Sequence, residues 1–258
     1  MKNELLPEQK IIHPSEVVAL YGPFMDRTIF LEDSTEMWEG VNKNQLQAKE
    51  EILRLVDEAL QRGEGLTISL LGNMFSGKTT VVCLVAPELN DRGEVGVYKH
   101  QKDKSRTGEP LVTNAGLSIE AGHYGSIEDV DNDKQILIID EFQFNTIDSV
   151  KEIIDFLQKR KEEGKITIIS QLDFNYRREP WQTTLPLLTN ADRIFVLRAR
   201  CENCGQPAEF PQREVNGRPA HVDDPEIVVG GKEAYSARCW CCHQVGGKEP
   251  GQPSLTGF

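Results

Sequence analysis

Basic residues are in deficit along this chain. Lysine and arginine number 29 against 41 aspartates and glutamates, for a formal net charge of −12. A surface that holds a nucleic-acid backbone needs a surplus of Lys and Arg, so we expect no nucleic-acid partner. An acidic protein can still bind a nucleotide, because backbone N–H groups, one lysine and Mg²⁺ meet the phosphates locally.

Long apolar runs are also absent. None approaches the roughly 20 residues that a membrane-spanning helix needs, so we expect no membrane partner. The first ten residues, Met1 to Lys10, are polar and acidic and contain no apolar signal segment. We therefore expect a cytoplasmic protein.

Cysteine is scarce except in one region. Of six cysteines, five lie between Cys201 and Cys242, where two C-x-x-C pairs stand close together. Four thiolates at this spacing can complete a tetrahedral zinc site, and four protein ligands leave no open position for chemistry. The sequence therefore predicts a structural zinc ion held by Cys201, Cys204, Cys239 and Cys242.

Three alternatives to this zinc site remain open at this stage. Cys241 or His243 could replace Cys242 as a ligand, and either C-x-x-C pair could have a redox role. The sixth cysteine, Cys83, stands apart and is expected to be a small buried apolar residue.

Strand and helix patterns alternate in the middle of the chain, which indicates a doubly wound α/β fold with a mainly parallel sheet. Helices are expected from about Lys78 and over Asp148 to Lys161, and Pro87 is expected to kink the first of these or end it early. Short apolar runs predict buried strands at Leu66–Leu71, Val95–Lys99, Gln135–Asp140, Ile166–Ser170 and Arg193–Leu197.

Four segments follow from this pattern. Residues 1–65 form an N-terminal β–α extension, with a strand at Thr28–Leu31 and a helix at Gln45–Arg62, and we expect it to pack on the core. The apolar face of that helix is predicted to consist of Leu46, Leu53, Val56 and Leu60. Residues 66–200 form the main domain, 201–245 a small metal-held lobe, and 246–258 a loose tail.

A phosphate-binding motif occupies the junction between the first main strand and its helix. The residues Gly72-Asn73-Met74-Phe75-Ser76-Gly77-Lys78-Thr79 fit G-x-x-x-x-G-K-[ST] at every fixed position. Such a P-loop surrounds the β-phosphate with backbone N–H groups, its lysine reaches the β and γ oxygens, and the hydroxyl of Thr79 can ligate Mg²⁺.

Two carboxylates follow the run Ile136–Ile139. Asp140 is placed to hold Mg²⁺ through water, and a turn at the end of the strand can bring Glu141 into the same cleft. Glu141 could take the proton of an attacking hydroxyl or, in an ordinary ATPase, of a water molecule. We expect Glu141 to work near the usual glutamate pKa of about 4.3.

Taken together these motifs resemble the type II thymidine kinases, the family that includes the cytosolic human enzyme and most bacterial ones. The resemblance covers residues 66–245 and rests on the P-loop, the cysteine lobe and two further stretches, Asp140–Phe144 and Leu172–Trp181. It implies a RecA-like P-loop domain, a zinc-anchored lasso loop over the nucleoside, Mg²⁺ with ATP, thymidine as acceptor, and a homotetramer or a dimer.

The same resemblance implies roles for individual residues. Glu141 is the general base, and Asp140, Glu141, Phe142 and Gln143 lie on the phosphate side. The thymidine site consists of the aromatic residues Phe144, Trp181 and Tyr235 and the lasso residues Val228, Val229, Gly230 and Gly231. The segment Lys99–Gly116 departs from the family pattern, because Asp103 and Arg106 are spaced one residue off the family's acidic and basic pair.

The rival interpretation is a regulatory or nucleic-acid-associated P-loop ATPase with a zinc ribbon. A nucleic-acid-binding ribbon should be basic, whereas seven acidic residues between Glu202 and Glu233 roughly balance the cations of this lobe. The rival also leaves Phe144, Trp181 and Tyr235 unexplained. The sequence therefore favours the kinase.

Overall fold

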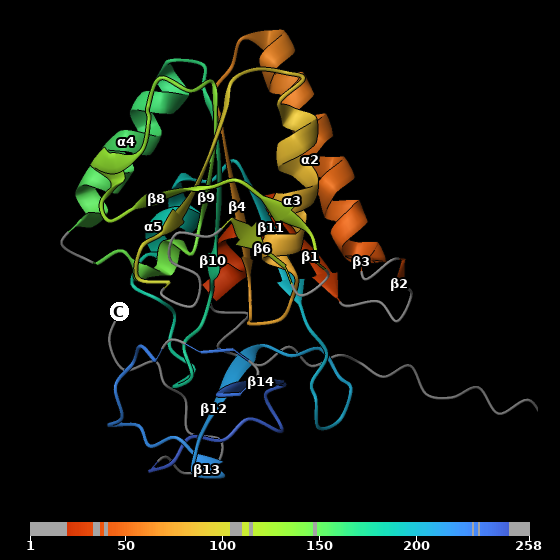
Figure 1. Ribbon diagram of the computed structural model, residues 1–258, viewed down its shortest axis with the longest axis vertical. Helices are drawn as coiled ribbons and strands as arrows, with labels where there is room; N and C mark the ends of the chain where they lie inside the picture. Colours follow the sequence, from red (N-terminus) through yellow and green to blue (C-terminus); the bar gives the residue numbers. More distant parts are fainter. Residues whose placement is uncertain are drawn as a thin grey trace, which may run out of the picture.

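A seven-stranded parallel sheet forms the centre of the computed structural model (Figure 1). Its strand order is β1-β11-β4-β10-β9-β5-β8. The structure describes residues 20–32, 37–38, 41–103, 110–113, 116–146, 149–228, 230–231 and 233–247. The sheet strands are β1 (Thr28–Glu32), β4 (Leu66–Gly72), β5 (Val95–His100), β8 (Gly122–Tyr124), β9 (Ile136–Asp140), β10 (Ile166–Leu172) and β11 (Arg193–Arg198).

Helices cover both faces of this sheet (Figure 1). On one face lie α2 (Lys43–Arg62) and α3 (Lys78–Leu89), and on the other α4 (Val150–Glu162) and α5 (Thr184–Asn190). Side chains alternate accordingly, so Ile136 and Ile138 of β9 pack with α2 and α3, whereas Leu137 and Ile139 pack with α4. The predicted α/β fold is confirmed.

The predicted strands and helices are all present, with ends that differ by one or two residues. Pro87 does not end its helix, because α3 continues to Leu89 and the proline lies in its last turn, where one missing N–H costs a single backbone hydrogen bond. No helix among the described residues is long and apolar enough to cross a bilayer.

A small lobe lies beyond the carboxyl ends of the central strands (Figure 1). It holds an antiparallel sheet of β12 (Phe210–Val215), β13 (Arg218–Pro219) and β14 (Tyr235–Arg238). Four more short strands pair as β2 (Met37–Trp38) with β3 (Val41–Asn42) and β6 (Leu111–Val112) with β7 (Ser118–Ile119). The sequence did not predict these strands, because none of them contains an apolar run of the kind that identifies the buried sheet strands.

Residues before the P-loop strand are integrated into the main domain. β1 pairs with β11 along its whole length and forms one edge of the sheet. α2 buries Ala48, Ile52, Val56 and Ala59, while the predicted face residues Leu46 and Leu60 are only half-buried at its margin. Gly63, at φ 66°, ends the helix in the left-handed conformation. The segment boundaries at 65, 200 and 245 stay predictions.

Truncating Ile52 to alanine tests how tightly α2 is attached. The side chain of Ile52 is fully buried in the cluster formed by α2, α3 and the sheet. Ile52→Ala should lower the free energy of unfolding by about 2–5 kcal/mol, because the cavity left behind cannot close completely. Urea denaturation measures the change, with Glu50→Ala on the exposed side as control. An unchanged midpoint for Ile52→Ala would mean that α2 contributes nothing to the core.

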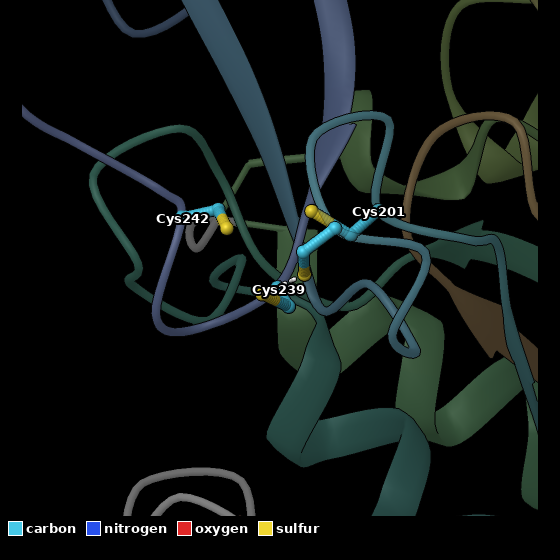
Figure 2. Close-up of side chains that lie close together, drawn as sticks. Cys201, Cys239 and Cys242 are labelled. Carbon is cyan, nitrogen blue, oxygen red and sulfur yellow. Dashed lines mark hydrogen bonds between the residues drawn. The ribbon is translucent and has the colours of Figure 1, made fainter.

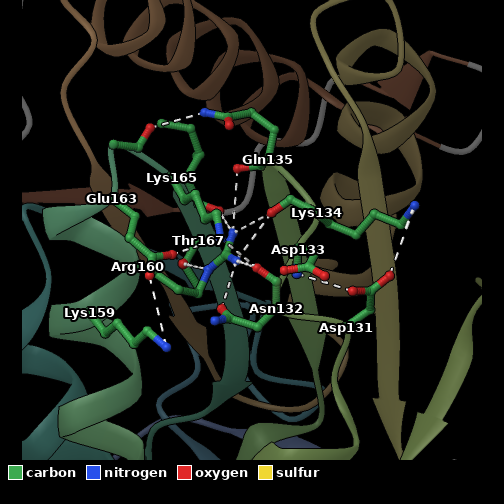
Figure 3. Close-up of polar contacts among 12 residues, drawn as sticks. Asp131, Asn132, Asp133, Lys134, Gln135, Lys159, Arg160, Glu163, Lys165 and Thr167 are labelled. Atoms are coloured by element: carbon green, nitrogen blue, oxygen red, sulfur yellow. Dashed lines mark hydrogen bonds and ion pairs between the residues drawn. The ribbon is translucent and has the colours of Figure 1, made fainter.

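A fully buried arginine joins the loops at the opposite, amino-terminal edge of the sheet (Figure 3). The Nε of Arg160 donates to Thr167 Oγ1 at 2.9 Å, and its two Nη atoms donate to the carbonyls of Asn132, Lys134 and Ile166 at 3.1, 3.1 and 2.8 Å. Burial lowers the pKa of Arg160 to about 10, so it remains charged at neutral pH. Arg160 thus joins α4 to β9 and β10 and is structural.

Candidate active site

A cavity of about 740 Å³ opens between the carboxyl ends of the central strands and the small lobe. This is the edge at which open α/β sheets bind their ligands, and the volume suits a small-molecule site. Residues of the P-loop, of the Asp140–Phe144 stretch and of the small lobe all line the cavity. All three predicted parts of the site therefore face a single space.

The P-loop connects β4 to α3, as its motif requires. Gly77, at φ 87°, adopts the left-handed conformation that lets the loop turn directly into the helix. The Nζ of Lys78 donates to the carbonyls of Gly72 and Asn73 at 3.0 and 2.9 Å. Burial lowers the pKa of Lys78. The loop residues that line the cavity are Met74, Phe75, Gly77, Lys78 and Thr79.

Three predicted loop residues, Gly72, Asn73 and Ser76, do not line the cavity. The Asn73 side chain points into the protein instead, donating to the carbonyl of Met74 at 3.0 Å and accepting from the backbone N–H of Ala199 at 3.1 Å. Asn73 thereby attaches the P-loop to the residue that follows β11.

Thr79 and Asp140 meet where α3 begins and β9 ends. The hydroxyl of Thr79 donates to Asp140 Oδ2 at 3.0 Å, and both residues line the cavity. A hydroxyl and a carboxylate oxygen this close can share one hard divalent cation, directly or through water, and oxygen ligands of this kind suit Mg²⁺. Burial raises the pKa of Asp140.

Glu141 follows Asp140 in a sharp turn. Its φ of 56° lies in the left-handed region, which is uncommon for a residue other than glycine and places its side chain in the same cavity as that of Asp140. Burial, together with the nearby carboxylates of Asp140 and Asp103, raises the pKa of Glu141 to about 7. The expected pKa of about 4.3 is therefore wrong, because the sequence does not reveal how deeply this carboxyl is buried.

The two residues after Glu141 behave differently from each other. Gln143 lines the cavity, donates through Nε2 to the carboxylate of Glu141, and accepts at Oε1 from the backbone N–H of Leu172 at 3.1 Å. Phe142 is fully buried in the apolar cluster around α4 and does not reach the cavity. Its predicted place on the phosphate side is wrong for the side chain, because the turn at Glu141 directs it into the core.

The three predicted aromatic residues also line the cavity. Phe144, Trp181 and Tyr235 all line it, and the rings of Phe144 and Trp181 stand edge to face with centroids 6.4 Å apart. The hydroxyl of Tyr235 donates to the carbonyl of Val228 at 2.8 Å and so holds the lasso segment in place. Val228, Gly230 and Gly231 line the cavity as well, while Val229 lies outside the described residues.

Four cysteines meet in the small lobe (Figure 2). The sulfur atoms of Cys201, Cys204, Cys239 and Cys242 all lie within 4.8 Å of one another. Zn–S bonds of about 2.3 Å in a tetrahedron place the sulfurs about 3.8 Å apart, so this cluster fits one zinc ion. Cys204 and Cys239 are 3.4 Å apart.

Neither alternative ligand, Cys241 nor His243, belongs to the cysteine cluster. Cys241 is exposed and does not belong to the cluster. The ring of His243 accepts at Nδ1 from Arg178 Nε at 3.1 Å, and its Nε2 lies 3.3 Å from the carbonyl of Pro211. Cys83 is buried in the apolar cluster of α2 and α3, as predicted for a small apolar residue.

Sequence reasoning missed several residues of this cavity. Lys99 is almost fully buried and lines the cavity, and its Nζ lies 3.9 Å from Asp103 Oδ2. Its position at the end of a predicted strand could have identified it as a site residue. Asn42, the N-cap of α2, and Gln45 in its first turn also line the cavity, and their N-x-x-Q spacing is a capping signal. Arg106 lies outside the described residues.

A second missed group lies on the lobe side. The Nδ2 of Asn175 donates to Glu226 Oε1 at 2.8 Å, and the hydroxyl of Tyr176 donates to the carbonyls of His221 and Asp224 at 2.9 and 2.8 Å. Asn175, Tyr176 and Glu226 line the cavity. These bonds join the main domain to the lobe, and no local pattern in the sequence indicates them.

Comparison with solved structures adds little. The flagellar accessory protein FlaH from Methanocaldococcus jannaschii is 14% identical, with a TM-score of 0.34 over 52% of this chain and 70% of that one. A likeness this low carries no argument.

Comparison with protein families and curated proteins is more informative. The thymidine kinase family model matches residues 66–243. A thymidine kinase of Halobacterium salinarum is 32% identical over 191 residues, which cover 68% of this chain and 92% of that protein. A thymidine kinase of Coprothermobacter proteolyticus is 37% identical over 183 residues, which cover 69% of this chain and 90% of that protein. The chain belongs to the thymidine kinase family.

Proposed function

We propose that this thymidine kinase carries out the whole reaction, transfer of the γ-phosphate of ATP to the 5′-hydroxyl of thymidine, in the 740 Å³ cavity. The observation that carries the proposal is that one continuous space is lined by a P-loop, a pair of acidic residues and an aromatic wall. Phosphoryl transfer needs little covalent chemistry from the protein and depends on position and electrostatics, so these three parts suffice.

Lys78, Thr79 and Asp140 hold the phosphate end. Lys78 leaves the carbonyls of Gly72 and Asn73 for the β and γ oxygens, which offer its ammonium a full charge instead of a dipole. Thr79 and Asp140 are the residues that would hold Mg²⁺, Asp140 through water. When bound, Mg²⁺ neutralises part of the negative charge on the phosphates.

Glu141 acts as the general base. The 5′-oxygen of thymidine forms a bond to the γ-phosphorus as the bond from that phosphorus to the β–γ bridging oxygen breaks, ADP departs, and the hydroxyl proton passes to the carboxylate of Glu141. The Nε2 of Gln143 donates to that carboxylate and fixes its direction. A pKa of about 7 places Glu141 close to working pH, where a base accepts a proton most effectively.

The other end of the cavity binds the nucleoside. Thymidine is neutral and offers little charge, so flat apolar contact with Phe144, Trp181 and Tyr235 and hydrogen bonds from backbone groups must recognise it. Those backbone groups belong to the lasso, Val228, Val229, Gly230 and Gly231. The four cysteines would hold a structural zinc ion, which would fix the lobe from which the lasso extends.

The rival function, an ATPase with a nucleic-acid-binding zinc ribbon, is not favoured. Family membership explains the P-loop and the cysteine lobe together. The net charge of −12 also gives a nucleic acid little to bind.

The family resemblance also extends to assembly and compartment. We propose a homotetramer, or failing that a dimer, in the cytoplasm, where the reducing environment keeps a thiolate cluster available for zinc. Light scattering would give the number of 29.1 kDa chains in one particle.

Dependence of ADP release on thymidine tests the function. The purified protein with Mg-ATP should release ADP at a rate that rises at least tenfold when thymidine is added, because a bound 5′-hydroxyl replaces water as the acceptor. DNA in place of thymidine should have no effect. ADP release that responds to DNA and ignores thymidine would favour the ATPase.

A further inference from the structure

The amino-terminal turn of α2 forms part of the wall of the nucleotide cavity. Asn42 and Gln45 line it together with Gly77, Lys78 and Thr80 of the P-loop and its helix. Both belong to the extension that precedes residues 66–243, the region matched by the thymidine kinase family. The position of this turn is therefore a feature of this chain and not of the family region.

The side-chain amide of Gln45 is fixed through its oxygen, while its nitrogen makes no hydrogen bond to the described residues. Its side chain is 7% exposed, and its Oε1 accepts the backbone N–H of Asn42 at 3.1 Å in a capping box. Its Nε2 donates no hydrogen bond to any described residue. Gln45 lines the cavity, and its Nε2 is not among the fully buried polar atoms of the described residues, so this N–H₂ group can reach an acceptor bound in the cavity.

The location of that Nε2 indicates what the acceptor is. A Cβ on Gly77 would overlap it, so the amide lies directly against the glycine that precedes Lys78. The first turn of α2, a helix of 20 residues, carries no acidic side chain, and the partial positive charge of its N-terminus is not neutralised there. Both features favour an anion, and the anion that a P-loop holds is a phosphate.

We propose that Gln45 is a nucleotide-binding residue whose Nε2 donates a hydrogen bond to the phosphate chain of ATP. This inference rests on the proposed function, because it assumes that the P-loop holds ATP. Gln45 supplements Lys78 from outside the region that the family model matches and makes the extension part of the nucleotide site. Its Oε1, fixed by Asn42, sets the direction of the donating nitrogen.

Two substitutions separate this role from helix capping. Gln45→Glu keeps the acceptor of the capping box, since Gln and Glu serve equally at that position, but replaces the donor with a negative charge facing the phosphates. Gln45→Ala removes both functions. Gln47→Ala is the matched control, because Gln47 is exposed on the same helix two residues away.

The measurements are steady-state kinetics and calorimetric binding of a non-hydrolysable Mg-ATP analogue. We expect Gln45→Glu to raise the KM for Mg-ATP and the Kd of the analogue by at least roughly tenfold, and Gln45→Ala by about three- to tenfold. The KM for thymidine and the melting temperature of Gln45→Glu should stay near those of the unmodified protein. Gln47→Ala should change neither the KM for Mg-ATP nor the Kd.

Unchanged analogue binding by Gln45→Glu in a protein that phosphorylates thymidine would overturn this inference and leave the proposed function intact. Tighter binding by either variant would also overturn it, because Gln45 would then obstruct the P-loop. If the unmodified protein binds the analogue but does not phosphorylate thymidine, the proposed function fails and the binding data still decide the role of Gln45.

Discussion

Replacing Glu141 with glutamine should lower kcat by about 10²–10⁴, with little change in the affinity for Mg-ATP. Glutamine keeps the size of the side chain and can still bond to Gln143, but it cannot accept the proton of the 5′-hydroxyl. Steady-state assays with thymidine measure the change. Glu128→Gln, on an exposed residue outside the cavity, is the control and should be silent. Near-normal turnover by Glu141→Gln would remove Glu141 from the role of base.

The pH profile gives the same test a second readout. The pKa of Glu141 is raised to about 7, so the fraction of active carboxylate and with it kcat/KM should fall as the pH drops through 7. The residual activity of Glu141→Gln should lack this acidic limb. A variant that keeps the limb unchanged would assign the titration to another group.

Loss of the metal should have the second large effect. The protein should contain one zinc ion per chain by elemental analysis, and Cys201→Ser or Cys239→Ser should abolish it, because a ligand set of three thiolates is open and weaker. The lobe should then become sensitive to protease and the KM for thymidine should rise by at least about tenfold, since the lasso loses its anchor.

The binding of Mg-ATP separates a local effect from general unfolding. It should persist in both serine variants, because the P-loop belongs to the parallel sheet and not to the lobe. Cys241→Ser is the matched control, since Cys241 lies in the same segment but outside the cluster. A protein without zinc whose four thiols titrate freely would refute the metal site.

Local signals in the sequence were sufficient for the P-loop, the cysteine cluster and every strand of the large sheet except the short edge strand β8. Strands β4, β9 and β10 are buried on both faces, so their composition alone identifies them. The P-loop and the C-x-x-C pairs have fixed spacings because one phosphate or one metal ion sets their geometry.

Features that depend on contacts between residues distant in sequence could not be predicted from the sequence. The raised pKa of Glu141 comes from burial and from Asp103, which lies on another strand connection. The place of Gln45 beside Gly77 depends on how α2 packs against α3, and the bond between Asn175 and Glu226 depends on how the lobe docks. None of these follows from a local period or motif.

A nucleoside panel tests the central claim most directly. The purified protein is incubated with Mg-ATP and, separately, with thymidine, deoxycytidine, deoxyadenosine and deoxyguanosine, and the products are identified by mass. We predict thymidine 5′-monophosphate and ADP in equal amounts, with thymidine preferred over both purine nucleosides, because a narrow aromatic wall favours the smaller pyrimidine base. ADP that forms at the same rate without any nucleoside, with no monophosphate in any reaction, would contradict the account.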